Sequence, residues 1–372
     1  MGKSFFLLNL FLLSTFTFSN DKELLPLEIH YINVGQGGST LIVGPNGTKI
    51  LYDFGNKNGR DSLVPYLDSL GWGSKKLHYS ILSHKDQDHF NGYKGLIDGG
   101  YDFKIKNYVS GSSNKKGMKL NNNWFLVTKL TTAGEATQLI PGIDISLGGG
   151  ASAFVAYASG RFFDGTEVKV SNENDFSAVL LITYKNFQFI LDGDLGSGSE
   201  KCSNHNTKQS QIQKRVADLL IKNRKLTAEH GVDVMHIAHH GSQSSTSAGY
   251  VNQIKPEIGI VSVGQNCTYR HPDKVVMDML LKPFSTLSTG ACVDLTALKE
   301  VYQTDKGSTN CSNNRADASN TGFIGGDIVI KTDGIASYSV NTSGALWIAD
   351  KKVFEDKPTS TMYQLDEISI NY

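Results

Sequence analysis

Short stretches of alternating hydrophobic and polar residues follow one another along this chain, and glycine and asparagine separate them. Alternation with a period of two predicts strands, and the separating residues predict tight turns. Residues 61–70, 209–225 and 272–282 have helical spacing instead, so that Leu63 and Leu67 fall on one face of the first stretch. The predicted strands are residues 27–34, 40–43, 49–54, 79–82, 178–184, 187–191, 232–238, 258–263, 327–331 and 337–340. The pattern therefore predicts mixed α and β structure, and we find no repeat of fixed period.

Residues 98–165 interrupt this pattern, because they are rich in glycine, asparagine and lysine and have only weak periodicity. Such a segment is typical of loops. We interpret it as a loop-rich insertion that shapes a substrate cleft, within a single domain that spans residues 20–372.

The N-terminus has the pattern of an export signal. Lys3 precedes an apolar run from Ser4 to Phe18, and small and polar residues follow that run. A run of about 15 residues is short for a membrane span and typical of a cleavable signal peptide. We therefore expect a signal peptide at residues 1–19, a secreted or periplasmic mature protein, and no stable membrane association. An uncleaved N-terminal anchor is the alternative.

The four cysteines, Cys202, Cys267, Cys292 and Cys311, are an even number without a CxxC pair. This spacing offers neither a zinc ribbon nor a thioredoxin-type motif. In an oxidising compartment they would form two disulfide bonds, for which we favour Cys292 with Cys311 and Cys202 with Cys267. Free, buried thiols are the alternative.

The charges of the chain balance, with 36 lysines and arginines against 36 aspartates and glutamates. This composition excludes a disordered polyelectrolyte and a protein that holds nucleic acid through its overall positive charge. It says nothing about local charge, for which the positions of the ten histidines are more informative.

The strongest chemical signal lies in residues 83–89, where two imidazoles and two carboxylates follow an apolar strand within six residues. A tight loop after a strand lets these side chains converge. Crowded carboxylates are costly unless a cation offsets them. A divalent metal explains the cluster, since imidazole suits zinc and carboxylate suits zinc or manganese. A polar surface loop is the alternative.

Three further features each follow a predicted strand: Asp194, the pair His239 and His240, and His271. A Gly-Asp turn or a pair of histidines is a weak signal when it stands alone. Together with residues 83–89, these features predict one site at the strand ends. His236 lies within a predicted strand, and we expect it to be packed rather than to bind metal.

The residues HKDQDH at 84–89, the Gly-Asp pair at 193–194 and HHGS at 239–242 together resemble the metallo-β-lactamase fold. More specifically, the chain is similar to the exported hydrolase domain of ComEC-type competence proteins. Further residues that carry the likeness are 32–37, 52–55, 174, 177–180, 262–264, 271–272, 304–307 and 332–334. The resemblance implies an α+β fold, a four-layer αβ/βα sandwich with a metal site at the strand ends.

The resemblance also implies a site for two divalent metal ions, zinc or manganese. The implied ligands are His84 and Asp86 for one ion, Asp88 and His89 for the other, Asp194 as the bridge, and His239, favoured over His240, to complete the second site. Typical members have histidine in place of Asp86, and a further histidine where this chain has only residues 172–175. One ion would therefore be bound mainly by oxygen, so a mononuclear or manganese-loaded site is also consistent. The resemblance argues against β-lactamase activity.

Such a site predicts hydrolysis of a phosphodiester. A divalent ion lowers the pKa of water toward ~7 and so supplies hydroxide at neutral pH. We expect Asp88 to orient the water as well as bind metal. His271, or His240, would bind phosphate or protonate the leaving group. A structural role before Pro272 is the alternative for His271.

The substrate remains open between two classes of phosphodiester. The resemblance favours DNA, and Lys104, Lys106 and the lysines at 115–119 could follow a strand of nucleic acid. A solvated loop with incidental lysines is the alternative for this run. Secreted phosphorylcholine esterases share the fold, and a choline group would need an aromatic cage, for which Trp72 and Trp124 are candidates. A third hypothesis is a binding protein that has lost its activity. We expect no obligate protein partner.

Overall fold

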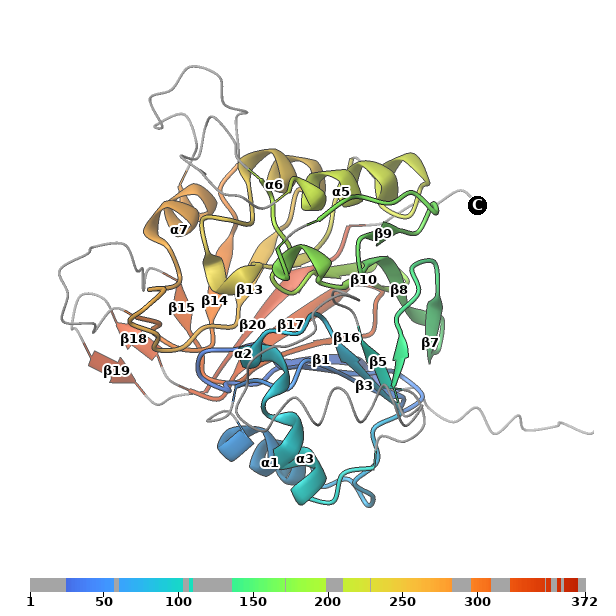
Figure 1. The fold of residues 1–372 in the computed structure, drawn as a ribbon. Coiled ribbons are helices and arrows are strands. Elements are labelled where there is room, and N and C mark those ends of the chain that lie inside the picture. The colour runs from blue at the N-terminus through green and yellow to red at the C-terminus, as the bar shows by residue number, and fades with distance from the viewer. Residues whose placement is uncertain are drawn as a thin grey trace, which may run out of the picture.

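Two β-sheets pack face to face in the computed structural model, and helices cover their outer faces (Figure 1). The structure describes residues 25–56, 60–102, 107–109, 136–170, 172–198, 210–227, 229–282, 296–308, 322–344, 346–348, 353–355 and 358–366. Helices α5 (Ile212–Lys222), α6 (Ala248–Ile254) and α7 (Lys274–Leu281) lie on one side, and α1 (Arg60–Ser69) and α3 (Tyr93–Asp98) on the other. This is the expected four-layer α+β sandwich.

The first sheet combines the beginning and the end of the described chain. Its order is β20 (Thr359–Gln364), β17 (Ser337–Thr342), β16 (Ile328–Thr332), β1 (Leu27–Tyr31), β2 (Thr40–Val43), β3 (Lys49–Tyr52), β4 (Tyr79–Leu82), β5 (Asn107–Val109) and β6 (Ala136–Gln138). The strands from β20 to β3 pair antiparallel, and those from β3 to β6 pair parallel.

The second sheet contains the middle of the chain. Its order is β15 (Phe323–Ile324), β14 (Glu300–Gln303), β13 (Ile258–Val261), β12 (Val234–His236), β11 (Phe187–Leu191), β10 (Val179–Tyr184), β8 (Ala151–Ala158) and β7 (Asp144–Gly148), and β9 (Arg161–Phe162) pairs with β8. A separate hairpin joins β18 (Leu346–Ile348) and β19 (Val353–Glu355). The strands from β11 to β15 are parallel, so the loops that follow them meet at one edge.

Three hydrophobic clusters occupy the three interfaces between the layers. Alternation along β11 shows how the sequence builds them: Phe187 and Phe189 pack between the sheets, whereas Ile190 packs with the helices of the second sheet. On the other side, Leu63 of α1 packs with Leu51 of β3. Because each strand presents alternate side chains to opposite faces, a sheet covered on both faces needs this two-sided burial.

Most of the elements predicted from periodicity are confirmed, with shifted ends, but the predicted loop-rich character of residues 98–165 is wrong at β5 and β6 of the first sheet and over 144–162. This segment forms β7, β8 and β9 of the second sheet. In β8, Ala153 and Val155 pack between the sheets, and Phe154 packs on the helix side. A strand that is buried on both faces has no polar alternation, which explains the weak periodicity.

Several expectations fall on residues outside the described part of the chain. These are the signal peptide, the lysine run, Trp124 and the three cysteines other than Cys267, so export and disulfide pairing stay predictions. Among the described residues, no helix combines the length and the apolar character needed to cross a membrane.

Candidate metal centre

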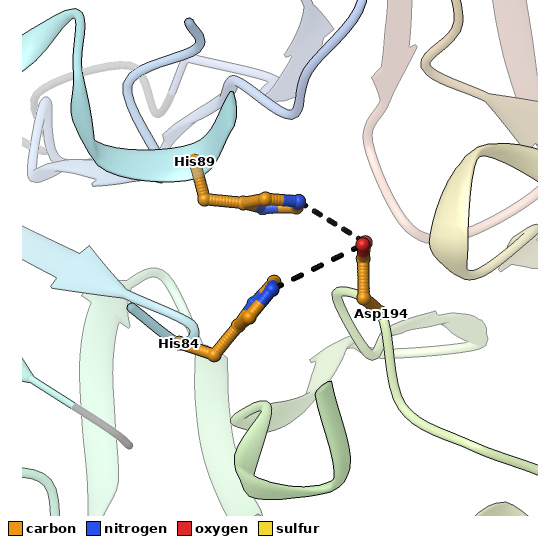
Figure 2. A group of neighbouring side chains, drawn as sticks. All are labelled: His84, His89 and Asp194. Atoms are coloured by element: carbon orange, nitrogen blue, oxygen red, sulfur yellow. Dashed lines mark ion pairs between the residues drawn. The ribbon is translucent and has the colours of Figure 1, made fainter. Parts of the chain in front are cut away.

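Histidine and aspartate side chains from several strand-end loops meet at one edge of the sandwich. His84 follows β4, His89 lies in the short helix α2 (Gln87–Phe90), and Asp194 follows β11. Figure 2 shows the imidazoles of His84 and His89 pointing toward the carboxylate of Asp194. His240 belongs to the turn η2 (His239–Gly241) after β12. The predicted convergence at the strand ends is therefore present in the structure.

His84, His89 and Asp194 form the first group that could hold a metal ion. The Nε2 atom of His89 lies 3.2 Å from Oδ1 of Asp194, and Nε2 of His84 lies 4.0 Å from its Oδ2. All three side chains are buried. Asp86 lies beside this group, with Oδ2 3.6 Å from Nε2 of His84, and is more exposed.

Asp88, His89 and His240 form a second, overlapping group. The Nε2 atom of His240 lies 3.3 Å from Oδ2 of Asp88 and 3.6 Å from Oδ2 of Asp194. Asp194 therefore lies between the two groups, where a bridging carboxylate would be needed.

Hydrogen bonds at Nδ1 orient the imidazoles and fix where their protons are. His240 Nδ1 lies 2.8 Å from the carbonyl oxygen of Ser262, which can only accept, so Nδ1 carries the proton. Ser83 Oγ donates to Asp53 at 2.7 Å and therefore accepts from His84 Nδ1 at 2.9 Å. In the neutral form of both rings, the lone pair is then at Nε2, as a metal ligand requires.

His89 is oriented in the same way, by Asp53. Its Nδ1 lies 2.6 Å from Oδ2 of Asp53, which is itself 1% exposed and also accepts from the backbone N–H of Ser83 at 2.7 Å. Sequence reasoning placed Asp53 only within the family likeness and gave it no role. Its position directly after a buried strand, at the same edge as residues 83–89, was the available signal.

The Nε2 atoms of His84, His89 and His240 are buried and, within the described residues, lack a hydrogen bond of good geometry. Carboxylate oxygens lie 3.2–4.0 Å from them. Buried polar atoms are normally satisfied, and three convergent exceptions beside carboxylates need an explanation. A nitrogen and oxygen donor set of this kind fits divalent zinc or manganese.

The backbone around the site is unusual at Gly193 and at the two adjacent histidines. Gly193 has φ +54°, and a Cβ there would approach Tyr52 Oη to 3.0 Å and Ser177 Oγ to 3.1 Å, so the turn that presents Asp194 requires glycine. His239 and His240 have φ 51° and 54°, which is rare for residues with a side chain. Strained conformations of this kind concentrate at functional sites.

The charged and buried groups of the centre shift one another's pKa values. Although burial opposes it, the nearby histidines lower the pKa of Asp194 well below its usual range, and the His240 contact lowers that of Asp88. Burial, with His239 and His240 nearby, lowers the pKa of His271 to about 3. His271 is therefore a neutral imidazole at physiological pH.

The structure distinguishes the two adjacent histidines that the sequence did not separate. His240 is 3% exposed at its side chain and belongs to the second group, whereas His239 is 21% exposed with Nε2 3.8 Å from Oδ2 of Asp194. Ser244 Oγ lies 2.8 Å from Nδ1 of His239, and Asn174 Nδ2 lies 3.2 Å from its Nε2. The geometry therefore favours His240 as the ligand in place of His239.

His271 and His236, the other two histidines considered in the sequence analysis, differ in role. The ring of His271 lies 5.5 Å from that of His239 and 6.3 Å from that of His240, at the side of the centre. His236 lies outside both groups: its Nδ1 is 2.9 Å from Oδ1 of the buried Asp192, and its ring stacks on Tyr31. The packed role expected for His236 is confirmed.

Comparisons with known proteins agree with the fold. A family model described as "Metallo-beta-lactamase superfamily" matches residues 32–100, which contain the loop at 84–89. The chain is 23% identical over 274 residues to ComE operon protein 3 of Bacillus subtilis, covering 68% of this chain and 30% of that protein. It is 26% identical over 258 residues to Recombination protein 2 of Haemophilus influenzae, covering 68% and 26%.

The chain thus spans less than a third of the length of these curated relatives. A similar solved structure is that of the metallo-beta-lactamase fold protein YhfI from Bacillus subtilis, with a TM-score of 0.38 and 11% identity. The two structures match over 65% of this chain and 88% of YhfI.

Proposed function

We propose that this chain, which has the metallo-β-lactamase fold and resembles ComEC-type competence proteins, is a secreted metal-dependent hydrolase that cleaves phosphodiester bonds in nucleic acid. Metal-dependent hydrolysis is the activity typical of the fold. The likeness to ComEC-type competence proteins and the name of Recombination protein 2 support nucleic acid as the substrate.

One observation carries the proposal: the buried Nε2 atoms of His84, His89 and His240, which lack a hydrogen bond of good geometry to any described residue, converge on Asp194. This arrangement fits two ions. Asp88, His89 and His240 would hold one ion, and His84 with Asp86 would hold the other. Asp194 would contact both, because its oxygens lie within 4.0 Å of all three imidazole nitrogens.

Divalent ions bound there would supply Lewis acidity at a phosphoryl oxygen and activate water at neutral pH. Side chains of the protein would orient the water and bind the phosphate. Asp88 is the least buried member of its group, with a side chain 30% exposed, so an oxygen of its carboxylate can accept a hydrogen bond from the attacking water and orient it. His271 is neutral because its pKa is about 3, so it would bind a phosphoryl oxygen through an N–H rather than act as an imidazolium acid.

Metal analysis of the purified protein and turnover of bis-4-nitrophenyl phosphate test the proposal together. We expect bound zinc or manganese and hydrolysis that a chelator abolishes. His84→Ala should lose one ion and the hydrolysis, and Asp194→Asn should lose both ions and the hydrolysis. Unchanged turnover in either variant would show that the metal mechanism is wrong.

The structure offers less support for the phosphorylcholine esterase. Trp72, a candidate for an aromatic cage, lies under Nζ of Lys49 at 4.5 Å. Lys49 begins β3, whereas the metal centre lies beyond the other end of that strand, at Asp53. Trp72 is therefore remote from the reacting phosphate.

We also propose that residues 1–19 are removed during export. N-terminal sequencing of protein recovered from the extracellular or periplasmic fraction tests this directly. Recovery of a chain that still begins at Met1 would contradict it.

A further inference from the structure

Tyr269 is an exposed aromatic side chain beside the metal centre. It is 67% exposed, whereas every other Phe, Tyr and Trp whose side chain the structure describes is buried or half-buried. Aromatic rings are normally at least partly buried because of their large apolar area. A fully presented ring next to a candidate catalytic site is therefore a candidate for contact with substrate.

The ring of Tyr269 faces that of His271. The two rings are nearly parallel, with an interplanar angle of 8° and centroids 6.2 Å apart. His271 in turn stacks at 6.3 Å on His240, one of the candidate ligands. The rings of Tyr269, His271 and His240 therefore follow one another, with His240 in the metal group and Tyr269 at the outer end.

The loop that carries Tyr269 is held in place by hydrogen bonds. Asn266 Oδ1 accepts hydrogen bonds from the backbone N–H groups of Thr268 at 3.0 Å and Tyr269 at 3.4 Å. The backbone carbonyl of Asn266 accepts from the N–H of Arg270 at 2.9 Å. Ser308 Oγ binds both the N–H and the carbonyl of Asn266, at 2.9 and 2.8 Å. The ring is thus presented on a fixed backbone, which reduces the ordering cost of binding.

We propose that Tyr269 is a stacking platform for a nucleobase of the substrate, adjacent to the phosphate that is cleaved. This inference rests on the proposed phosphodiesterase function and extends it to substrate choice. A flat, single exposed face suits a base, because stacking needs one ring and tolerates any base. A choline group would instead need several rings around the cation, whereas Tyr269 is the one exposed Phe, Tyr or Trp ring among the side chains that the structure describes.

Three esters that share one leaving group provide the test: thymidine 5′-(4-nitrophenyl phosphate), methyl 4-nitrophenyl phosphate and 4-nitrophenylphosphorylcholine. Each releases nitrophenolate, so kcat and KM are measured in the same way, and only the group that Tyr269 could contact differs. We expect the wild-type protein to prefer the thymidine ester over the methyl ester. In Tyr269→Ala, the ratio of their kcat/KM values should fall about tenfold, mainly through KM.

Two further variants separate stacking from other effects. Tyr269→Phe keeps the ring and should keep the wild-type ratio. Ile335→Ala is the matched surface control, because Ile335 is 54% exposed in the turn that contacts Asn186, at the opposite end of β11 from Asp194.

Four outcomes would overturn the proposal. The ratio could be unchanged in Tyr269→Ala, or Tyr269→Phe could lose as much as Tyr269→Ala, which would implicate the hydroxyl. Selective loss of phosphorylcholine hydrolysis would mean that the ring binds a cation. Failure of the wild-type protein to hydrolyse any of the three esters would contradict the phosphodiesterase function as well, whereas the first three results leave that function intact.

Discussion

Asp53→Asn is the substitution that tests most directly whether hydrogen bonds at Nδ1 prepare the histidines for metal. In the wild-type protein, three donors converge on this carboxylate: the N–H of Ser83 at 2.7 Å, Oγ of Ser83 at 2.7 Å and Nδ1 of His89 at 2.6 Å. Asparagine has nearly the same shape, but one of its oxygens becomes an NH₂ group. At least one of the three donors must then face another donor.

The preferred orientation of the new amide follows from the backbone. The N–H of Ser83 cannot reverse its role, so the amide oxygen should stay opposite it, and the NH₂ group should face His89. The imidazole of His89 can accept only by moving its proton from Nδ1 to Nε2, the atom that lies 3.2 Å from Asp194. His89 would then lack the lone pair that a metal needs.

The expected cost is about 10- to 100-fold in metal affinity, as for other residues that orient metal-binding histidines, or roughly 1.4–2.8 kcal/mol. Competition with a chromophoric chelator measures the affinity for zinc and manganese, and thermal unfolding of the metal-free protein shows whether the variant folds. Activity on bis-4-nitrophenyl phosphate should fall at limiting metal and recover in part at high metal concentration.

Asp233→Asn is the matched control. Asp233 is a half-buried carboxylate that also accepts a backbone N–H, that of Gln188 at 2.7 Å, but it precedes β12 and so lies at the end away from the centre. The Asp233→Asn variant should bind metal with the affinity of the wild-type protein. If Asp53→Asn bound both ions with wild-type affinity, or if the control lost as much, the argument from proton position would be refuted.

Three further predictions concern the same centre and its surroundings. His240→Ala should remove one ion per chain, whereas His239→Ala should retain both with weaker binding, as elemental analysis of the dialysed variants will show; equal losses would contradict the assignment of His240. Although burial opposes it, Asp194 raises the pKa of His89 and of His240, so these rings hold protons that metal must displace. The affinity for metal should therefore fall as the pH is lowered. Calorimetry in buffers of different ionisation enthalpy should detect the proton release. Burial raises the pKa of Asp233 to about 7. The protonated carboxyl therefore stabilises the folded protein fully below the unfolded pKa near 4, and this contribution is lost as the pH rises through 7. The melting temperature of Asp233→Asn should rise relative to that of the wild-type protein between pH 4 and 8, and a constant difference would contradict this.

The metal loop could be predicted from the sequence because its chemistry is local. Residues 84–89 place four candidate ligands in one short segment, and the apolar strand before it fixes their place in the fold. The partners that orient these ligands could not be found in that way. Asp53 lies 36 positions from His89, and the parallel pairing of β3 with β4 brings these two residues together. Ser177 lies 93 positions from His84 and precedes β10 of the second sheet, so only the packing of the two sheets brings this pair together.

The choice between His239 and His240 shows a second limit. Both residues have the same side chain and the same strand before them, and sequence reasoning favoured His239. Both also have left-handed backbone conformations, which turn the chain so that the two rings point in different directions, with centroids 6.2 Å apart. Periodicity arguments assume regular strands or helices and do not apply to such a turn.

The balanced charge of the whole chain conceals a local excess of negative charge at this edge of the sandwich. Asp53, Asp88 and Asp194 lie within hydrogen-bond or ion-pair distance of the same few histidines, and the pKa values of Asp88 and Asp194 are lowered, so these two carboxylates stay ionised at any physiological pH. A phosphodiester is itself an anion and would be repelled by this cluster. Bound divalent ions are the largest charges that such a site can hold, and they would reverse its sign. Metal must therefore bind before substrate, and the metal-free protein should show no measurable affinity for a phosphodiester at this centre, even though its net charge is unremarkable.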